Sequence, residues 1–175
     1  MFVWGIDPGL SRCGYAVLDR QGRAPRVVAM GVLTTPPDDA VPQRLHAIQR
    51  DVRALLAEFP PVEVAIERVL FSVNVRTAIG VAQAAGVVMT EAVDAGALVH
   101  EYSPNEIKQA VAGDGAADKR QVEAMVRRLL RIERPIRPVD AADAAAVALC
   151  HVAHAPLRAR VRTASQAPCL ERRAR

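Results

Sequence analysis

Two apolar segments of the sequence each end in a carboxylate. The segment "VWGID" ends at Asp7, and "EVAIE" ends at Glu67. Side chains alternate between the two faces of a strand, so Asp7 would share a face with Gly5, and Glu67 with Ala65. If the segments are neighbouring parallel strands, both acids stand side by side at one edge of the sheet. The two small residues would leave room on that face for another element to approach closely.

A third segment, "DAADAAAVA", contributes two more acids. Asp140 and Asp143 are one helical turn apart and are surrounded by alanines, which keep the packing distance short. Pro138 marks the start of this helix, where the helix dipole favours the ionised form of both aspartates. We therefore predict that four carboxylates from three segments converge at one place.

Four anions at one place repel each other unless cations neutralise them. All-oxygen ligands without His or Cys favour a hard ion, Mg²⁺ or Mn²⁺. Two such ions about 4 Å apart hold the attacking and leaving oxygens of a phosphodiester and activate a water molecule. A helix-capping pair with two acids at strand edges would explain each residue singly. The four together favour a metal site.

Length and composition indicate a single domain. A chain of 175 residues buries a full hydrophobic core. No apolar stretch is long enough and free enough of charge to span a membrane, and no basic signal-peptide region is visible. The cysteines lack metal or disulfide spacing, which fits a reducing compartment, so we expect a cytoplasmic protein. They are Cys13, Cys150 and Cys169.

The basic charge of the chain belongs to its C-terminal segment. The net charge is +4, and residues 156–175 hold six arginines and one glutamate, a net of +5. The remaining chain is therefore close to neutral, and its charge alone says little about nucleic acid. We expect residues 1–155 to form the domain and residues 156–175 to form a basic, disordered tail that binds phosphates non-specifically.

Hydrophobic periodicity and turn residues predict an α/β fold with a five-stranded mixed sheet and helices on both faces. The first three strands form an antiparallel meander, and two parallel strands follow through helical crossovers. The strands are expected at 2–7, 14–20, 26–35, 62–69 and 97–103. The helices are expected at 42–59, 75–95, 104–113, 117–132 and 140–155.

Four segments together resemble the RuvC-type Holliday-junction resolvases in order and spacing, over about residues 1–155. The resemblance implies a ribonuclease H-like fold, a homodimer, and Mg²⁺-dependent paired nicking of four-way DNA junctions in recombination and repair, with two ions per site. It also implies cooperation with the RuvA–RuvB branch-migration complex. By motif, the catalytic and metal-binding acids are Asp7, Glu67, Asp140 and Asp143. The segments are "GIDPGLSRCGYAVLD", "VAIERVLFSVNVRTAIGVAQAAG", "YSPNEIKQAVAGDGAADKRQV" and "DAADAAAVALCH".

Lys108 and Lys119 are the only lysines among 23 basic residues. A sequence that otherwise uses arginine keeps lysine at two places, both within the matching segments. An ammonium meets a phosphate as a compact point charge, whereas arginine imposes a planar fork. Chance drift is the alternative. Members of the RuvC family carry functional lysines at the matching positions, and we infer that these two contact DNA beside the scissile phosphate.

Further DNA-binding residues are predicted around the acids and on the "RRLLR" helix. Phe71 would stack on an unpaired base at the junction centre. Family members carry an aromatic here, and whether Leu70 or Phe71 stacks is left open, as is a buried role for the phenyl ring. Phosphate contacts are expected from one asparagine and three arginines, for which a solvated helix face is the alternative explanation. That set is Asn74, Arg76, Arg120 and Arg127.

The helix predicted at 75–95 is apolar nearly all round, which suggests that it packs on the sheet and on a partner chain. A two-fold dimer would present two active sites to the two symmetric strands of a junction. The last helix carries Cys150, His151 and His154 at a loose ligand spacing. On an alanine-rich helix, we expect these three side chains to serve packing.

Three other classes of protein share some of these sequence features. A ribonuclease H-like nuclease of the YqgF type, acting on RNA, would share the acids, but the two lysine segments favour the resolvase. Actin-like ATPases and sugar kinases also open with a strand, an aspartate and a glycine, but they need two such domains. A junction-binding protein without catalysis would not need four converging acids, which weaken DNA affinity when no metal is bound.

Overall fold

The computed structural model describes residues 1–22, 24–69 and 75–165, and for residues 75–76 and 156–165 it describes the backbone alone. The strands are β1 (Phe2–Asp7), β2 (Arg12–Asp19), β3 (Arg26–Thr34), β4 (Pro61–Glu67) and β5 (Leu98–Tyr102). The helices are α1 (Val41–Glu58), α2 (Val75–Asp94), α3 (Pro104–Ala112), α4 (Lys119–Leu130) and α5 (Val139–Ser165).

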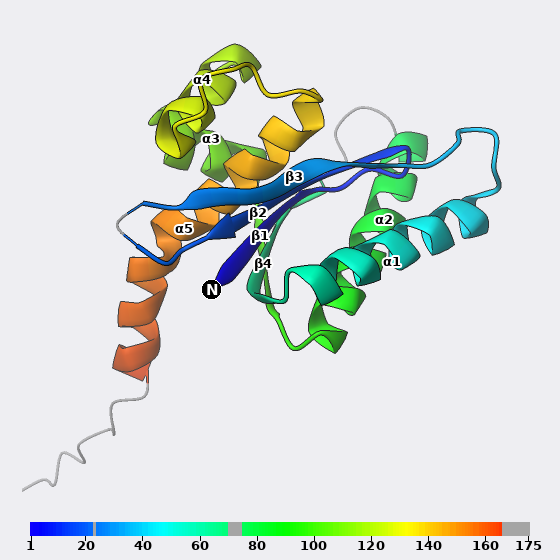
Figure 1. Ribbon diagram of the computed structural model, residues 1–175, viewed down its shortest axis with the longest axis horizontal. Coiled ribbons are helices and arrows are strands. Elements are labelled where there is room, and N and C mark those ends of the chain that lie inside the picture. Colours follow the sequence, from blue (N-terminus) through cyan, green and yellow to red (C-terminus); the bar gives the residue numbers. More distant parts are fainter. Residues whose placement is uncertain (23, 70–74, 166–175) are drawn as a thin grey trace, which may run out of the picture.

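The five strands form one mixed sheet in the order β3-β2-β1-β4-β5 (Figure 1). The strands β1, β2 and β3 pair antiparallel, whereas β4 lies parallel to β1, and β5 lies parallel to β4. This is the predicted topology. In the register of β1 and β4, Gly5 pairs with Ala65 and Ile6 with Ile66, so Asp7 follows directly beside the end of β4.

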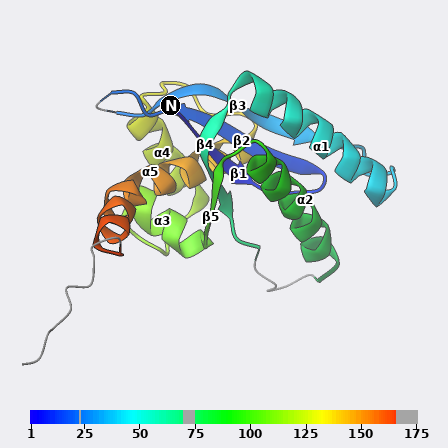
Figure 2. The same cartoon turned by 90° about the horizontal axis from the view of Figure 1, so that it is seen from below.

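Helices cover both faces of the sheet, as predicted. Helices α1 and α2 lie on one face, and α5 lies on the other together with α3 and α4 (Figures 1 and 2). The alternation along the strands matches these layers. Trp4 and Ile6 of β1 pack in the core with α1 and α2, whereas Ala65 of β4 packs in the core with α3, α4 and α5.

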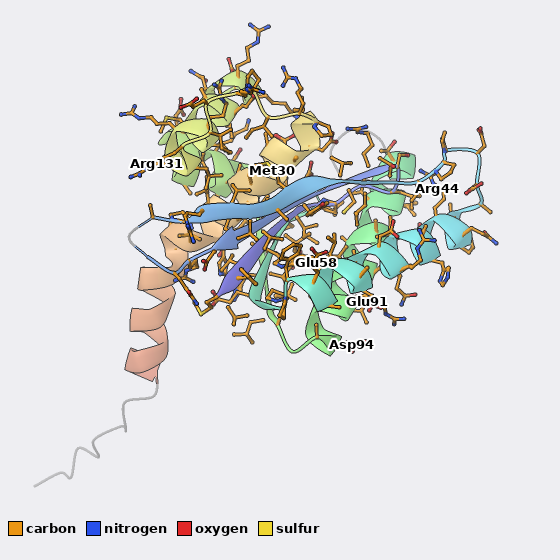
Figure 3. The ribbon with its side chains drawn as sticks, in the orientation of Figure 1. Met30, Arg44, Glu58, Glu91, Asp94 and Arg131 are labelled. Atoms are coloured by element: carbon orange, nitrogen blue, oxygen red, sulfur yellow. The ribbon has the colours of Figure 1, made fainter. Side chains whose placement is uncertain are left out.

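A buried carboxylate ties α1 to α2 (Figure 3). Glu91 of α2 accepts hydrogen bonds from Gln49 and Arg53 of α1, and only 4% of its surface is exposed. Arg44, near the start of α1, donates to the hydroxyls of Thr35 and Ser11. These contacts fix α1 and α2 as one layer behind the sheet.

Helix α5 approaches the sheet closely because the contact surfaces are built from glycine and alanine. A Cβ atom added at Gly5 would collide with the backbone carbonyl of Ala144, and one added at Gly14 would collide with that of Asp140. Between the sheet and the neighbouring helices, α5 buries a run of small residues. These are Ala141, Ala142, Ala144, Ala145, Ala146 and Ala148.

Several elements differ from the predicted bounds. Strand β4 ends at Glu67 rather than at residue 69, and α4 begins at Lys119 because Asp118 caps it and accepts a hydrogen bond from the backbone of Gln121. Helix α5 continues to Ser165, so the first half of the predicted disordered tail is helical. Arginine and alanine are strong helix formers, which favours this continuation.

Across the described ranges, we find no helix with both the length and the apolar character that a membrane span needs.

Candidate active site

Three of the four predicted acids line one cavity of about 330 Å³, together with both lysines of the chain. The acids come from the ends of β1 and β4 and from the start of α5. The lysines come from α3 and α4. Apolar side chains and a proline complete the wall. The lining residues are Asp7, Glu67, Asp143, Lys108, Lys119, Pro104, Ile107, Val122 and Ala146.

The backbone positions these acids. The parallel pairing of β1 and β4 brings Asp7 beside Glu67, because Ile6 and Ile66 are directly paired one residue earlier. Because α5 packs directly against Gly5, Asp143 in the second turn of the helix lies over the end of β1. The side-chain alternation that directs Asp7 to the α5 face is the one predicted from the sequence.

Burial and the neighbouring carboxylates disfavour the ionised forms of Asp7 and Glu67 in this cavity. Burial, the charge of Glu67 and the charge of Asp143 together raise the pKa of Asp7 to about 7. Burial and the charge of Asp143 also raise the pKa of Glu67. Lys119 acts in the opposite direction on both groups. A site that resists holding its own negative charges is suited to bind cations.

Lys119 is paired with one of the acids. Its Nζ atom lies 3.0 Å from Oδ2 of Asp143, and this hydrogen bond raises the pKa of the lysine. The capped start of α4 places Lys119 at the first helical position, and its side chain is 78% exposed. Lys108 projects from α3 into the same cavity, and its charge partly offsets the rise in the pKa of Glu67.

Asp140 does not line the cavity, in contrast to the other three predicted acids. Its Oδ2 atom accepts hydrogen bonds from Nη2 of Arg12 at 2.7 Å and from Nε at 3.1 Å. These bonds lower the pKa of Asp140. Asp140 stays near Asp7, whose pKa its charge helps to raise. Arg12 was not predicted, although it lies in the same sequence segment as Asp7.

Among the predicted DNA-binding residues whose side chains the structure describes, Arg120 and Arg127 do not line the cavity. Leu70, Phe71 and Asn74 lie outside the described residues. The backbone of Arg76 lies in the first turn of α2. Arg120 is exposed on α4, one residue after Lys119.

Arg127, also on α4, donates to the carbonyl groups of Ile132 and Glu133 beyond the end of the helix. That guanidinium therefore supports a chain turn in this structure. Arg131 ends α4 with φ of 56° and lies at the outer edge of the helical layer (Figure 3).

The histidines of α5 have different environments. His151 is fully buried, which agrees with the expected packing role, yet both ring nitrogens have polar partners: Tyr102 and Glu63. His154 lies one turn later, and its Nδ1 atom is 2.8 Å from the carbonyl oxygen of Cys150. The polar network around His151 was not predicted from the sequence.

We expect Asp7→Asn to stabilise the protein at pH 8 but not at pH 4, when a chelator has removed all metal ions. The carboxyl has a pKa of about 7 when folded against an ordinary value of 3.8, so its protonation favours the folded state, and this stability is lost as the pH rises toward 7. Asparagine does not ionise, so the Asp7→Asn protein does not lose this stability as the pH rises. Three pKa units correspond to ~4 kcal/mol, and we expect a gain of about 2–4 kcal/mol in the free energy of unfolding.

Urea unfolding at both pH values measures this difference. Asp140→Asn is the control with an effect of opposite sign. The hydrogen bond with Arg12 lowers the pKa of Asp140, so its ionised carboxylate stabilises the fold at pH values above the ordinary pKa of aspartate. An equal effect of Asp7→Asn at pH 4 and pH 8 would contradict the electrostatic explanation.

The sheet order, the layered helices and the carboxylates at the ends of two central strands define a ribonuclease H-like nuclease. Residues 3–151 match the family described as "Crossover junction endodeoxyribonuclease RuvC". The chain belongs to this family of crossover junction endonucleases. The match favours the junction resolvase over the YqgF-type alternative.

Relatives and solved structures agree with this assignment. A RuvC of Salinispora arenicola is 49% identical over 94% of this chain and 95% of its own length. A RuvC of Heliobacterium modesticaldum is 45% identical over 86% of this chain and 93% of its own length. Thermus thermophilus RuvC in complex with a Holliday junction substrate superposes with a TM-score of 0.85 at 36% identity, covering 90% of this chain and 96% of that one.

Proposed function

We propose that this endonuclease cuts four-way DNA junctions in the cavity of Asp7, Glu67 and Asp143, with Mg²⁺ as the ion. The observation that supports this proposal is the meeting of three carboxylates from three separate elements beside both lysines. A cavity with acids alone would repel DNA. The two ammonium groups give it a place for a phosphate.

The donor set fits hard divalent cations. All three acids offer carboxylate oxygens, which Mg²⁺ and Mn²⁺ prefer. Asp140 would be the fourth ligand if it exchanged its bond to Arg12 for the ion. When bound, a pair of such ions would neutralise the phosphodiester and activate the attacking water.

The residues of the chain perform the positioning. The pairing of β1 with β4 holds the backbone of Asp7 beside that of Glu67, which limits the positions that their carboxylates can take. Lys108 and Lys119 approach from the two helices opposite and meet the scissile phosphate as point charges. The apolar wall of Ile107 limits the access of water on that side.

Further residues would contact the DNA around the cavity. Leu70 or Phe71 would stack on a base at the junction centre, and Asn74 and Arg76 would meet the backbone nearby. Arg120 and Arg127 would extend the phosphate-binding surface along α4. Since Arg127 already donates to two carbonyl groups, Arg120 is the better placed of the pair.

A homodimer would form through α2. The outer side of this helix exposes Ile79 by 50% and Val93 by 60%, although the helix is apolar for most of its length. Between them, Gln83, Gly86 and Thr90 follow at helical spacing and are also exposed. Covering this stripe with a second copy would bury it and present two cavities to the two strands of a junction. The RuvA–RuvB complex would be a further partner.

A synthetic mobile four-way junction tests the proposed function. With Mg²⁺, we expect symmetric nicks in two opposing strands, and without a divalent ion we expect binding alone. Mn²⁺ should substitute for Mg²⁺. A linear duplex and an RNA–DNA hybrid are the comparison substrates. Cleavage of the hybrid without cleavage of the junction would overturn the proposal.

Lys119→Arg is expected to lower the cleavage rate by about tenfold or more while changing junction affinity less than about threefold. Arginine keeps the charge that attracts DNA, but its planar fork cannot occupy the position of the ammonium beside Asp143. Single-turnover cleavage and gel-shift titration separate the two quantities. Arg128→Lys, an exposed position on the same helix to which no DNA contact is assigned, is the matched control. Equal losses of rate and affinity, or no loss, would refute this role.

A further inference from the structure

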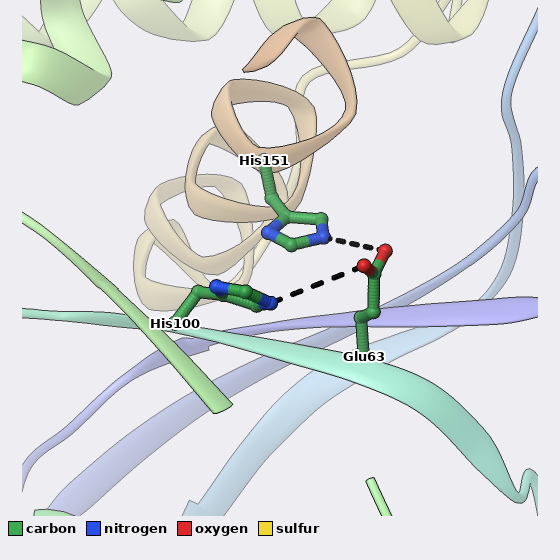
Figure 4. Close-up of side chains that lie close together, drawn as sticks. All are labelled: Glu63, His100 and His151. Carbon is green, nitrogen blue, oxygen red and sulfur yellow. Dashed lines mark hydrogen bonds and ion pairs between the residues drawn. The ribbon is translucent and has the colours of Figure 1, made fainter. Parts of the chain in front are cut away.

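We propose a second metal site, built from Glu63, His100 and His151, that binds a transition-metal ion of the Zn²⁺ class. These residues come from β4, β5 and α5, and their side chains point toward one another between the sheet and the helix (Figure 4). The site is independent of the carboxylate cavity, and the inference does not rest on the proposed function.

The ligand atoms are already close together. Oε2 of Glu63 lies 2.8 Å from Nε2 of His151, and Oε1 lies 3.9 Å from Nε2 of His100. One ligand atom from each residue can be chosen so that all lie within 4.8 Å of one another. Tetrahedral zinc with bonds of about 2.0–2.1 Å needs donors about 3.3 Å apart. Small side-chain movements therefore complete the geometry.

His151 is held in place by a partner on its other nitrogen. Its side chain is fully buried, and its Nδ1 atom lies 3.0 Å from the hydroxyl oxygen of Tyr102. Metal-binding histidines commonly have such an outer partner, which fixes the ring orientation and the tautomer. With an ion on Nε2, the neutral ring would carry its single proton on Nδ1, where the hydroxyl oxygen of Tyr102 accepts it.

Glu63 is an ionised ligand with one oxygen to spare. Burial alone would raise the pKa of Glu63, but the hydrogen bond with His151 and the charges of His151 and Arg20 lower it. Nη1 of Arg20 lies 3.1 Å from Oε2, so Arg20 would hold that oxygen while Oε1 binds the ion. The side chains of Glu63 and His100 are 21% and 28% exposed, which admits a water molecule as the fourth ligand.

Two imidazoles and one carboxylate distinguish this site chemically from the cavity of Asp7. Imidazole selects zinc, cobalt or nickel over magnesium. The two sites are also separate in space. Glu63 and Glu67 lie four residues apart on β4, which is ~13 Å of strand, and Asp143 and His151 lie eight residues apart on α5, which is ~12 Å of helix.

The site would therefore join β4 and α5 at the end opposite the carboxylate cavity. An ion bound there stabilises the folded state, because the three ligands are brought together only when α5 lies on the sheet. The expected consequence is a rise in unfolding temperature that Mg²⁺ does not reproduce.

Titration with Co²⁺ tests this site. The full-length protein is first stripped of metal ions with a chelator that is then removed, and excess Mg²⁺ is added to fill the carboxylate cavity. We expect one equivalent of Co²⁺ per chain with the strong visible absorption of a four- or five-coordinate site containing imidazole. Zn²⁺ should displace it and raise the unfolding midpoint. Glu63→Gln and His100→Ala should each abolish the absorption and the stabilisation.

The remaining two histidines of the chain provide matched controls. His46→Ala and His154→Ala should keep both signals, because neither side chain belongs to the cluster. Asp143→Asn should also keep them. Loss of the signals in Asp143→Asn with retention in a folded His100→Ala protein would assign the ion to the carboxylate cavity and overturn the proposal. Retention in Glu63→Gln and His100→Ala, or no absorption in the unmodified protein, would overturn it as well.

Discussion

Asp7→Asn is expected to lower junction cleavage by at least ~10³-fold, or ~4 kcal/mol in the activation free energy, while junction affinity stays equal or rises. Asp7 stands at the centre of the carboxylate cavity, where the charges of Glu67, Asp140 and Asp143 all act on it. The amide preserves the shape of the side chain but removes the negative charge that a divalent ion needs. The loss of one anion also reduces the repulsion of DNA.

Single-turnover cleavage in Mg²⁺ and gel-shift titration in chelator measure the two quantities. Asp51→Asn is the matched control, since Asp51 pairs with its neighbour Arg50 on α1, on the opposite face of the sheet. Loss of junction binding in a folded Asp7→Asn protein would show that this residue does more than support catalysis.

Gly5→Ala is expected to destabilise the protein by about 1–3 kcal/mol and to lower the cleavage rate by about 10²-fold. The added methyl group would collide with the carbonyl oxygen of Ala144, and it would also crowd Ala148. A backbone group of a packed helix cannot move aside as a flexible side chain can. Helix α5 must therefore lift, which carries Asp143 away from Asp7.

Urea unfolding and single-turnover cleavage measure these effects. Gly115→Ala is the control, because the nearest atom to its added Cβ lies at an ordinary contact distance of 3.7 Å. If Gly5→Ala left both stability and cleavage unchanged, α5 would not be seated on this part of the sheet in the working enzyme.

The strand ends of the site could be predicted from the sequence, because few physical rules are involved. The alternation of "VWGID" and "EVAIE" determines which face Asp7 and Glu67 share, and the crossover through a helix implies that the strands are parallel. Gly5 and Ala65 predicted where α5 approaches. The fold class, the five strands and the two helical layers follow from the same periodicities.

The ion pairs of the site could not be predicted in this way. Arg12 and Asp140 lie 128 residues apart, and an exposed arginine on a strand leaves no periodic signal of its partner. The pairing of Lys119 with Asp143 depends on the exact start of α4, which Asp118 sets two residues later than predicted.

The role of His151 was hidden for a different reason. A histidine on an alanine-rich helix fits a packing role, and its partners Glu63 and Tyr102 lie on two separate strands. Side-chain alternation places Glu63 on the same strand face as Glu67, but it does not identify the partners of Glu63. Side-chain networks that combine three elements depend on their relative placement, which local patterns do not encode.

The bond between Lys119 and Asp143 supplies the cavity with a counterion of its own. A divalent ion that recruits Asp143 must first displace this ammonium, which stays tethered to α4 at the cavity mouth and has lost its anionic partner. A phosphate of the arriving DNA is the natural replacement. Ion uptake and substrate engagement then favour each other by the same factor, as thermodynamic linkage requires. Such an enzyme is expected to hold its ions weakly in isolation and firmly once a junction is in place.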